Sequence, residues 1–317
     1  MTHNSTKTGP SAAGIDVGKD WLDLALDDRA ERWRLPNTDE GRLELVAMVI
    51  RLGIGRVGLE ASGGYERRAV AALREAGLDV VLFQPRQVRA YAVYRLRRAK
   101  TDAIDAGLIA ACTAAHGPGR AAPDRRLASL AEPLRLVEQI DEDVARLKTR
   151  REAYQDAHIR AHIATEIKRL KTERSARIKA LVAALRAHGD IAHRFDLVLS
   201  VPGIGPRTAL TLIVRMPELG ALTREQAASL AGLAPFDHSS GRHQGQRRIA
   251  GGRDIVRTAL YAAALPAAFR WNDALIRFYE RLKDAGKAHT QILVACARKL
   301  LIYANTVLAK NIPWHHA

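Results

Sequence analysis

The chain has 317 residues, 47% of them hydrophobic, and this length allows two or three domains with hydrophobic cores of their own. Lysine and arginine number 50 against 34 aspartate and glutamate, and the resulting net charge of +16 is typical of proteins with a polyanionic partner. The two cysteines, Cys112 and Cys296, are far apart and lack metal-ligand spacing, which argues against a disulfide framework or a zinc site and fits a reducing cytoplasm.

The chain begins with a polar segment, MTHNSTKTGPSAAG, and we expect residues 1–11 to form a disordered leader rather than a signal peptide. No uninterrupted apolar stretch approaches the roughly 18 residues of a membrane-spanning helix. We therefore predict a protein with neither a transmembrane helix nor a membrane partner.

Residues 12–125 mix strands and helices. GIDVG, DWLDLALDD and RWRLP predict three short strands in an antiparallel meander. TDEGRLELVAMVIRLG then predicts a helix capped by Thr38, and RVGLEA, ERRAVAALREAG and LDVVLFQP predict a strand, a helix and a fifth strand. AKTDAIDAGLIAACTAA predicts a further helix, capped by Thr101. This succession matches an RNase H-like α/β order.

Four acidic residues in this part suggest chemistry. Asp16 and Glu60 each follow a short apolar run that predicts a strand end, whereas Asp102 and Asp105 are three residues apart at a helix start and share one helical face. Two hard cations about 3.5–4 Å apart beside a phosphodiester would need such a set of carboxylates. The pattern predicts a metal site that cuts or rejoins nucleic acid.

Each acid also has a purely structural interpretation. Asp16 could cap the turn at Gly18, Glu60 could be an ordinary exposed glutamate, and Asp102 could complement the helix dipole. Asp105 has less of a structural reason, and two acids so close repel each other unless a cation or a proton intervenes. Asp23 alternates with apolar neighbours and is interpreted as the exposed face of its strand.

A basic and aromatic segment, QPRQVRAYAVYRLRRAK, precedes the acidic pair. Interleaved arginine and tyrosine suit contacts to a nucleic-acid backbone together with stacking on bases or ribose. An amphipathic helix with a solvated basic face would give the same pattern. The predicted nucleic-acid-binding residues are Arg86, Arg89, Arg95, Arg97, Arg98 and Lys100.

Residues 126–190 predict a long helical coiled-coil linker. From Leu134 to His188 there is neither glycine nor proline, with Pro133 and Gly189 at the borders, and apolar residues recur every three or four positions among dense mixed charges. One long helix and a helical hairpin fit this pattern equally, as do a spacer and a dimerisation arm.

Residues 191–317 predict a mainly α-helical domain. LVLSVPGIGPRTALTLIVRMPEL resembles a helix-hairpin-helix, in which Gly203 and Gly205 allow the tight turn and the next helix offers backbone N–H groups to a phosphate. The alternative for PGIGP is a plain loop.

A polar stretch follows, with Ser239, Ser240, Gly241 and His243 among arginines, and it is too polar for a core. It is therefore either a disordered loop or a functional one. The arginines predicted to hold phosphates near Ser240 are Arg242, Arg247, Arg248 and Arg253. Arg253, together with Arg257, could instead brace the helix that follows AGGR.

These pieces together resemble the insertion-sequence 110 family of transposases. GIDVGKDWLDLAL, GLEASGGYE, KTDAIDAG, SVPGIGPRTA and GLAPFDHSSGRHQGQRRIAGGRDIVRTALYAAAL follow one another in the order seen in that family, over nearly the whole chain. Its members are DEDD-type enzymes with an RNase H-like, RuvC-like N-terminal domain. The resemblance implies a site-specific recombinase that acts on donor and target DNA in the bacterial cytoplasm, associated with the nucleoid.

The resemblance also implies roles for single residues and for partners. Asp16, Glu60, Asp102 and Asp105 would bind Mg²⁺, with two ions possible, and Ser240 would be the nucleophile that joins transiently to DNA. Homodimers would assemble into tetramers, and a bridge RNA would choose the target and donor sites. The expected domains are the catalytic RuvC-like domain (12–125), the linker (126–190) and the transposase domain with the serine (191–317).

Two other functions stay open on the sequence. In a RuvC-like structure-specific endonuclease, water would attack the phosphodiester and Ser240 would be structural. In a nucleic-acid-binding protein, the RNase H-like fold would be inactive. Ser239 stands beside Ser240 as an alternative nucleophile, because serine chemistry alone does not distinguish the two.

Overall fold

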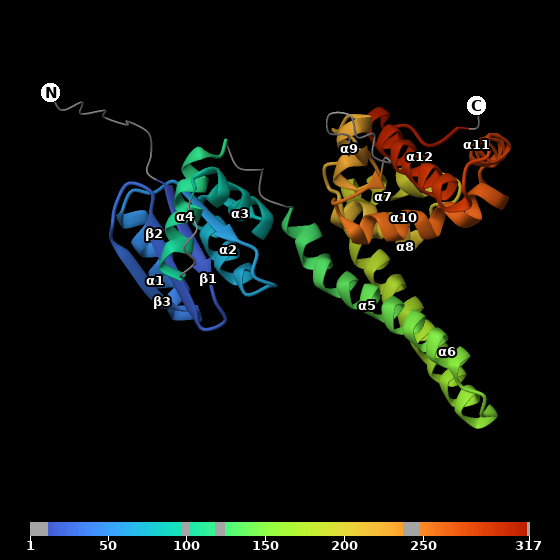
Figure 1. The fold of residues 1–317 in the computed structure, drawn as a ribbon, viewed down its shortest axis with the longest axis horizontal. Coiled ribbons are helices and arrows are strands. Elements are labelled where there is room, and N and C mark those ends of the chain that lie inside the picture. Colours follow the sequence, from blue (N-terminus) through green and yellow to red (C-terminus); the bar gives the residue numbers. More distant parts are fainter. Residues whose placement is uncertain (1–11, 97–101, 118–123, 237–247, 316–317) are drawn as a thin grey trace. The chain divides into compact units, whose positions relative to one another are not determined.

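The computed structural model describes residues 12–96, 102–117, 124–236 and 248–315, and for residues 102–105, Phe236 and Arg248 it describes the backbone alone. The chain forms two compact units, residues 1–122 and residues 123–317 (Figure 1).

The first unit is built on a five-stranded mixed sheet in the order β3-β2-β1-β4-β5. β1 pairs antiparallel with β2, as β2 does with β3, whereas β1, β4 and β5 run parallel. The predicted meander and the RNase H-like order are therefore confirmed. The strands are β1 (Ala12–Val17), β2 (Trp21–Leu26), β3 (Arg32–Pro36), β4 (Arg56–Glu60) and β5 (Asp79–Phe83).

Helices cover both faces of this sheet. Alternate strand residues such as Ile15 and Leu59 form one core with α1 (Asp39–Arg51) and α2 (Glu66–Glu75). On the other face Phe83 of β5 packs with α3 (Pro85–Tyr94) and α4 (Asp102–Ala115). Thr38 caps α1 as predicted, since its side chain accepts a hydrogen bond from the Gly41 N–H.

The second unit begins with a helical hairpin. α5 (Arg125–Ala153) and α6 (Ala157–Arg186) are separated by residues 154–156 and pack together around five buried residues, Ile140, Val144, Ile163, Ile167 and Leu170. This decides between the two predicted forms in favour of a folded-back pair. α5 starts at Arg125, one residue before the expected linker, and continues through Pro133, which borders the glycine- and proline-free run of the sequence.

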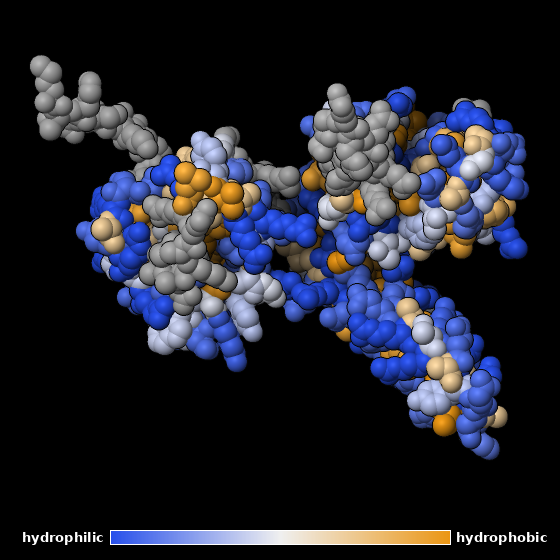
Figure 2. All heavy atoms as spheres, viewed as in Figure 1, coloured by the Kyte–Doolittle hydropathy of each residue, from blue (hydrophilic) through white to orange (hydrophobic). Residues whose placement is uncertain are grey.

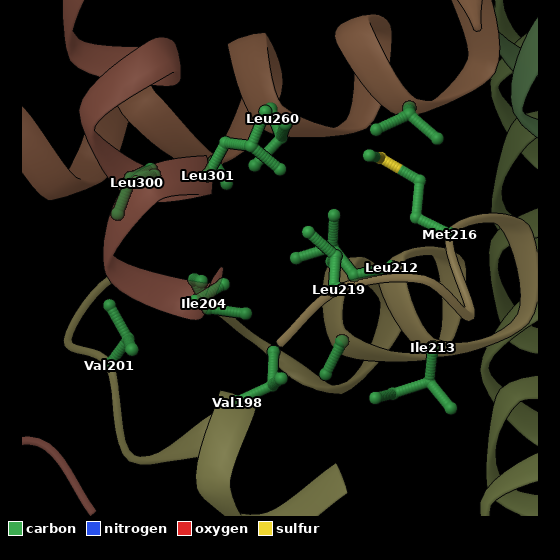
Figure 3. Packing of buried hydrophobic residues seen from close by; sticks show 14 of the residues in the cluster. Val198, Val201, Ile204, Leu212, Ile213, Met216, Leu219, Leu260, Leu300 and Leu301 are labelled. Carbon is green, nitrogen blue, oxygen red and sulfur yellow. The ribbon is translucent and has the colours of Figure 1, made fainter. Parts of the chain in front are cut away.

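The remaining helices enclose a large apolar core. Figure 3 shows Val198, Leu212 and Met216 facing Leu260 and Leu301 across it. The elements are α7 (Gly189–Leu199), α8 (Pro206–Arg215), α9 (Arg224–Leu230), β6 (Pro235–Phe236), β7 (Arg248–Ile249), α10 (Asp254–Pro266), the π-helical turn η1 (Ala267–Trp271), α11 (Asp273–Asp284) and α12 (His289–Lys310).

Within the described residues, α12 is the one helix long and apolar enough to cross a membrane by length and composition. Half of its apolar window is buried, and Cys296, Leu300 and Ala304 contribute to the core of this unit. Such burial is characteristic of a core helix in a folded domain.

Candidate functional site

Asp16 and Glu60 lie side by side at one edge of the sheet. Asp16 is the last but one residue of β1 and Glu60 is the last residue of the neighbouring parallel strand β4, each one position beyond the paired residues Ile15 and Leu59. Since side chains alternate along a strand, both carboxylates project to the face opposite Ile15, the face covered by α3 and α4. Both residues are half-buried. The predicted strand-end positions of this acidic pair are confirmed.

The same face of β1 and β4 touches α4 at two glycines. A Cβ on Gly14 would lie 2.1 Å from the Ala110 nitrogen and 2.3 Å from the Ala106 carbonyl oxygen, and a Cβ on Gly58 would lie 1.8 Å from Thr113 Oγ1. Only glycine lets the helix approach so closely. Gly14 and Gly58 are each two residues before an acid, so this contact holds α4 beside both carboxylates.

The start of α4 carries the second acidic pair. Asp102 is the first residue of the helix and precedes Ala106 by about one turn, or about 6 Å along the axis. Gly14, which Ala106 touches, is about 7 Å along β1 from Asp16. Arg56 at the start of β4 donates a hydrogen bond to the carbonyl of His116, just after the end of α4, so α4 runs opposite to β4 and its start lies toward the strand ends that carry Asp16 and Glu60. The side chains of Asp102 and Asp105 lie outside the described residues, and among those described no three potential ligands form a metal-binding group.

Asp23 belongs to the surroundings of this site, which its alternation with apolar residues did not indicate. It is directly opposite Asp16 in the β1–β2 ladder, and its side chain is only 19% exposed. Arg34, its partner in β3, donates two hydrogen bonds to it, at 2.7 and 2.8 Å. The interpretation as an exposed strand face is wrong: Asp23 is a neutralised carboxylate at the border of the acidic site.

Glu66 shapes the turn that follows Glu60, another role that the sequence did not reveal. One of its carboxylate oxygens accepts hydrogen bonds from the Ser62 N–H and hydroxyl, both at 3.1 Å, and from the Gly64 N–H at 2.8 Å. Burial alone would raise the pKa of Glu66, but these bonds and one from its own N–H hold that pKa below its ordinary value. The turn after Glu60 is therefore closed around a buried carboxylate.

The basic segment forms α3 and its end. Arg86, Arg89 and Arg95 are exposed, and none has an ion pair with another residue that the structure describes. The rings of Tyr91 and Tyr94 are 6.1 Å apart, and Tyr94 is 78% exposed. Exposed cations beside an exposed ring suit nucleic-acid contact, but a solvated helix face would look the same. Arg97, Arg98 and Lys100 lie outside the described residues.

The turn between α7 and α8 contains both glycines of the predicted helix-hairpin-helix. Gly203 has a φ of +97°, and a Cβ there would lie 2.3 Å from Cβ of Ala267 in η1. Its first role is therefore to let two segments of backbone meet. Gly205 is the N-cap of α8 and gives no side-chain hydrogen bond. An open hollow lies in front of this helix start, with Trp271 on its border.

The loop that contains Ser240 starts and ends in a two-stranded ribbon, β6 paired antiparallel with β7. Residues 237–247, which include Ser239, Ser240, Arg242, His243 and Arg247, lie outside the described residues. Gly232 and Gly252 adjoin this ribbon and pack backbone against backbone: a Cβ on Gly252 would lie 2.1 Å from the Gly232 nitrogen.

Arg253 braces the end of this ribbon. Its guanidinium donates to both carboxylate oxygens of Glu218, at 2.7 and 2.9 Å, and to the Arg215 carbonyl at 2.8 Å. Arg215 in turn donates to Glu138 of α5 at 2.9 and 3.2 Å. These bonds favour the bracing alternative for Arg253 over phosphate contact. Arg257 acts similarly, donating to the Gly251 carbonyl at 2.7 Å.

Both units match families of transposases. Residues 13–154 match the DEDD-type IS110 family described as "Transposase", and residues 195–280 match the family described as "Transposase IS116/IS110/IS902 family". The first match contains the four acids, and the second contains the ribbon and the loop between its strands.

Curated relatives extend over the whole chain. Pilin gene-inverting proteins of Moraxella bovis and Moraxella lacunata are each 27% identical to it, over 95% of this chain and 96% of the relative. A 43.6 kDa protein of insertion element IS110 from Streptomyces coelicolor is 36% identical over 38% of this chain and 30% of its own length.

Among solved structures, RuvC of Thermus thermophilus is similar to part of the chain. The structure in complex with a Holliday junction substrate is 18% identical and covers 33% of this chain and 93% of RuvC, with a TM-score of 0.28. A second RuvC structure is 19% identical, with the same TM-score.

Proposed function

The chain belongs to the IS110 family, whose members are DNA transposases and recombinases. We propose that it cuts and exchanges DNA strands with a magnesium site in the first unit and Ser240 in the second. In this proposal residues 12–125 hold the metal, residues 126–190 connect, and residues 191–317 supply the nucleophile.

The observation that carries the proposal is the placement of Asp16, the last but one residue of β1, beside Glu60, the last residue of the parallel strand β4. The helix that begins at Asp102 is held on the same face by glycine contacts. An arrangement whose only purpose was stability would not gather carboxylates there, because like charges repel at short range.

The donor set fits Mg²⁺, which prefers oxygen ligands. Asp16, Glu60, Asp102 and Asp105 would hold one or two ions, which when bound would stabilise negative charge on the attacked phosphodiester. The chain's own contribution is to orient the carboxylates: Gly14 and Gly58 set the height of α4, and Glu66 fixes the turn beside Glu60. Arg34 forms an ion pair with Asp23, the carboxylate opposite Asp16, and so balances its negative charge.

Ser240 would attack the phosphodiester and form a bond to DNA, with the deoxyribose hydroxyl as the leaving group. Serine is a weak nucleophile at its free pKa and needs electrostatic help at the phosphate. Arg242 and Arg247 of the same loop, and Arg248 at the start of β7, would hold neighbouring phosphates. The α7–α8 turn at Gly203 and Gly205 and the basic residues of α3 would contact nucleic acid further away.

We also propose that a bridge RNA selects the donor and target DNA and that homodimers assemble into tetramers in the bacterial cytoplasm, at the nucleoid. This rests on the family. A test is to sequence the RNA that purifies with the chain: a non-coding segment from beside the gene, with loops complementary to the DNA sites, supports guidance. Strand exchange between purified DNAs without any RNA would contradict it.

The products of the reaction test the central proposal. Rejoined strands from donor and target, formed with Mg²⁺ and absent in EDTA, are expected from the wild type. Asp102→Asn should lower the rates of both strand cutting and strand joining by at least ~100-fold, as expected when a metal-binding carboxylate is removed. Hydrolysed ends without any joined strands would favour the endonuclease alternative, and normal exchange by Asp102→Asn would contradict the tetrad.

A further inference from the structure

α6 presents two charged flanks, one on each side of its apolar seam of Ile163, Ile167 and Leu170. On the first flank the residues Glu166, Arg169, Glu173 and Arg177 are spaced three or four apart. They form a continuous ladder of ion pairs, at 2.6 Å (Arg169–Glu166), 3.1 Å (Arg169–Glu173) and 2.7 Å (Arg177–Glu173). This flank, the paired ladder, is neutralised within the helix.

The second flank carries only positive charge. Arg160, Lys168, Lys171 and Lys179 follow at intervals of eight, three and eight residues, which places them on one helical face. All four are exposed, and none forms an ion pair with any residue in the described ranges. We call these four residues, with Arg151 of α5, the basic flank. Figure 2 shows that the visible surface of the hairpin is mainly hydrophilic.

A shallow hollow lies on the basic flank. Arg151, Lys168 and Lys171 line it, with Ile167 at its base. The hydroxyls of Thr172 and Ser175, also in the lining, already donate to the Lys168 and Lys171 carbonyls at 3.1 and 2.9 Å. A partner would therefore be held here by charge rather than by hydroxyl hydrogen bonds.

Like charges on one helical face destabilise a helix slightly, so the unpaired flank has a cost that its paired counterpart avoids. Arg160 and Lys171 are eleven residues apart, or about 17 Å along the helix. A row of cations of this length fits the phosphates of a duplex, which carries one charge per about 1.7 Å of its axis.

A second copy of the hairpin offers less complementarity, because four of its acids, Glu142, Asp143, Glu166 and Glu173, already hold arginines. Along α6 no aromatic side chain interleaves with the basic flank, and the exposed ring of Tyr154 lies in the turn before α6; this spacing disfavours single strands, whose bases stack on successive rings. We propose that the basic flank of the α5–α6 hairpin binds the backbone of duplex DNA. This goes beyond the proposed chemistry and needs neither the acids nor Ser240.

The test uses the full-length chain in EDTA with a DNA duplex of arbitrary sequence, so that binding is measured without metal-dependent cleavage. Lys168→Gln with Lys171→Gln should weaken binding by roughly tenfold and lower the slope of log affinity against log salt by about 1.8, which is about 0.9 for each phosphate that is no longer neutralised. The matched control is Arg169→Gln with Arg177→Gln, which changes the charge equally on the paired ladder and should leave the slope within about 0.5 of the wild type.

Equal losses in the two double variants would overturn the proposal, because net charge rather than position would then be responsible. The proposal would also be overturned if Lys168→Gln with Lys171→Gln lost binding to RNA duplexes only. A change in the mass of this variant, measured by light scattering, that accounts for its weaker DNA binding would overturn it as well. If the basic flank contacts phosphates, Lys168→Arg with Lys171→Arg should bind duplex DNA as the wild type does. The thermal unfolding of all these variants should be unchanged. Because the assay excludes catalysis, failure here would leave the proposed function untouched.

Discussion

The acidic edge of the first unit and the ribbon of the second unit are supported in different ways. At the acidic edge, α4 meets β1 and β4 at Gly14 and Gly58, with no space for even a methyl group. The ribbon consists of strands of two residues each; Gly232 and Gly252 beside it also meet without space for a methyl group, but its end is held in addition by the hydrogen bonds of Arg253 and Arg257. A close backbone contact is lost as a whole when a side-chain atom is placed in it, whereas hydrogen bonds can be removed one at a time. The two halves of the proposed centre should therefore respond differently to mutation.

The largest effect is expected at Gly14. Gly14→Ala places a Cβ 2.1 Å from the Ala110 nitrogen, so α4 has to leave the sheet. We expect the free energy of unfolding of the first unit to fall by more than about 3 kcal/mol, with loss of DNA cleavage, as measured by chemical denaturation and a cleavage assay. Gly55→Ala is the control, since no atom lies within 4 Å of its Cβ. A stable, active Gly14→Ala protein would refute the steric account.

An intermediate effect is expected at the ribbon. Arg253→Ala removes two hydrogen bonds to Glu218 and one to the Arg215 carbonyl. Bonds to charged groups predict a loss of about 1.5–3 kcal/mol in the stability of the second unit. Strand joining should fall further than DNA binding. Arg270→Ala, at an exposed residue, should change neither stability nor joining; if Arg253→Ala reduces DNA binding and joining equally, a phosphate contact is the better assignment for Arg253.

The sequence predicted the sheet because its strands are short apolar runs between turns, and it predicted where Asp16 and Glu60 lie because each ends such a run. It could not reveal Glu66 or the Asp23–Arg34 pair, whose roles depend on contacts made only after folding. The sequence could not show that Pro133 lies within a helix for a related reason: proline usually ends a helix, but α5 continues through it and packs against α6 and α8. From its charge alone, Arg253 is a candidate for a phosphate contact. Its partner Glu218 is 35 residues away in the chain, and the sequence does not indicate that the two side chains pair.

A smaller effect is expected at Glu66, and it should depend on pH. Because the folded-state pKa of Glu66 is lowered, its stabilisation is complete above its unfolded value of about 4.5 and is lost as pH falls through the folded pKa. Glu66→Gln should therefore cost about 1–2 kcal/mol at pH 7. Thermal unfolding should show the gap to the wild type narrowing below pH 4.5. A gap that is constant from pH 7 to pH 3 would contradict the assigned role of its carboxylate.

The smallest effect is expected at Arg34, whose side chain is 54% exposed. Arg34→Gln should cost less than about 1 kcal/mol, as for other partly exposed ion pairs. It also leaves Asp23 without its arginine partner beside Asp16, so divalent cations should bind slightly more tightly. Isothermal titration with Mn²⁺ measures this change, and weaker binding in Arg34→Gln would count against a cation site at this edge.

The most direct measurement of the central claim is the covalent adduct between protein and DNA, trapped on a substrate cut in one strand and resolved under denaturing conditions. We expect an adduct with the wild type and with Ser239→Ala, and none with Ser240→Ala or Asp16→Asn, although all four proteins still bind DNA. An adduct that persists in Ser240→Ala, or that forms undiminished in Asp16→Asn, would contradict the assignment of the two halves.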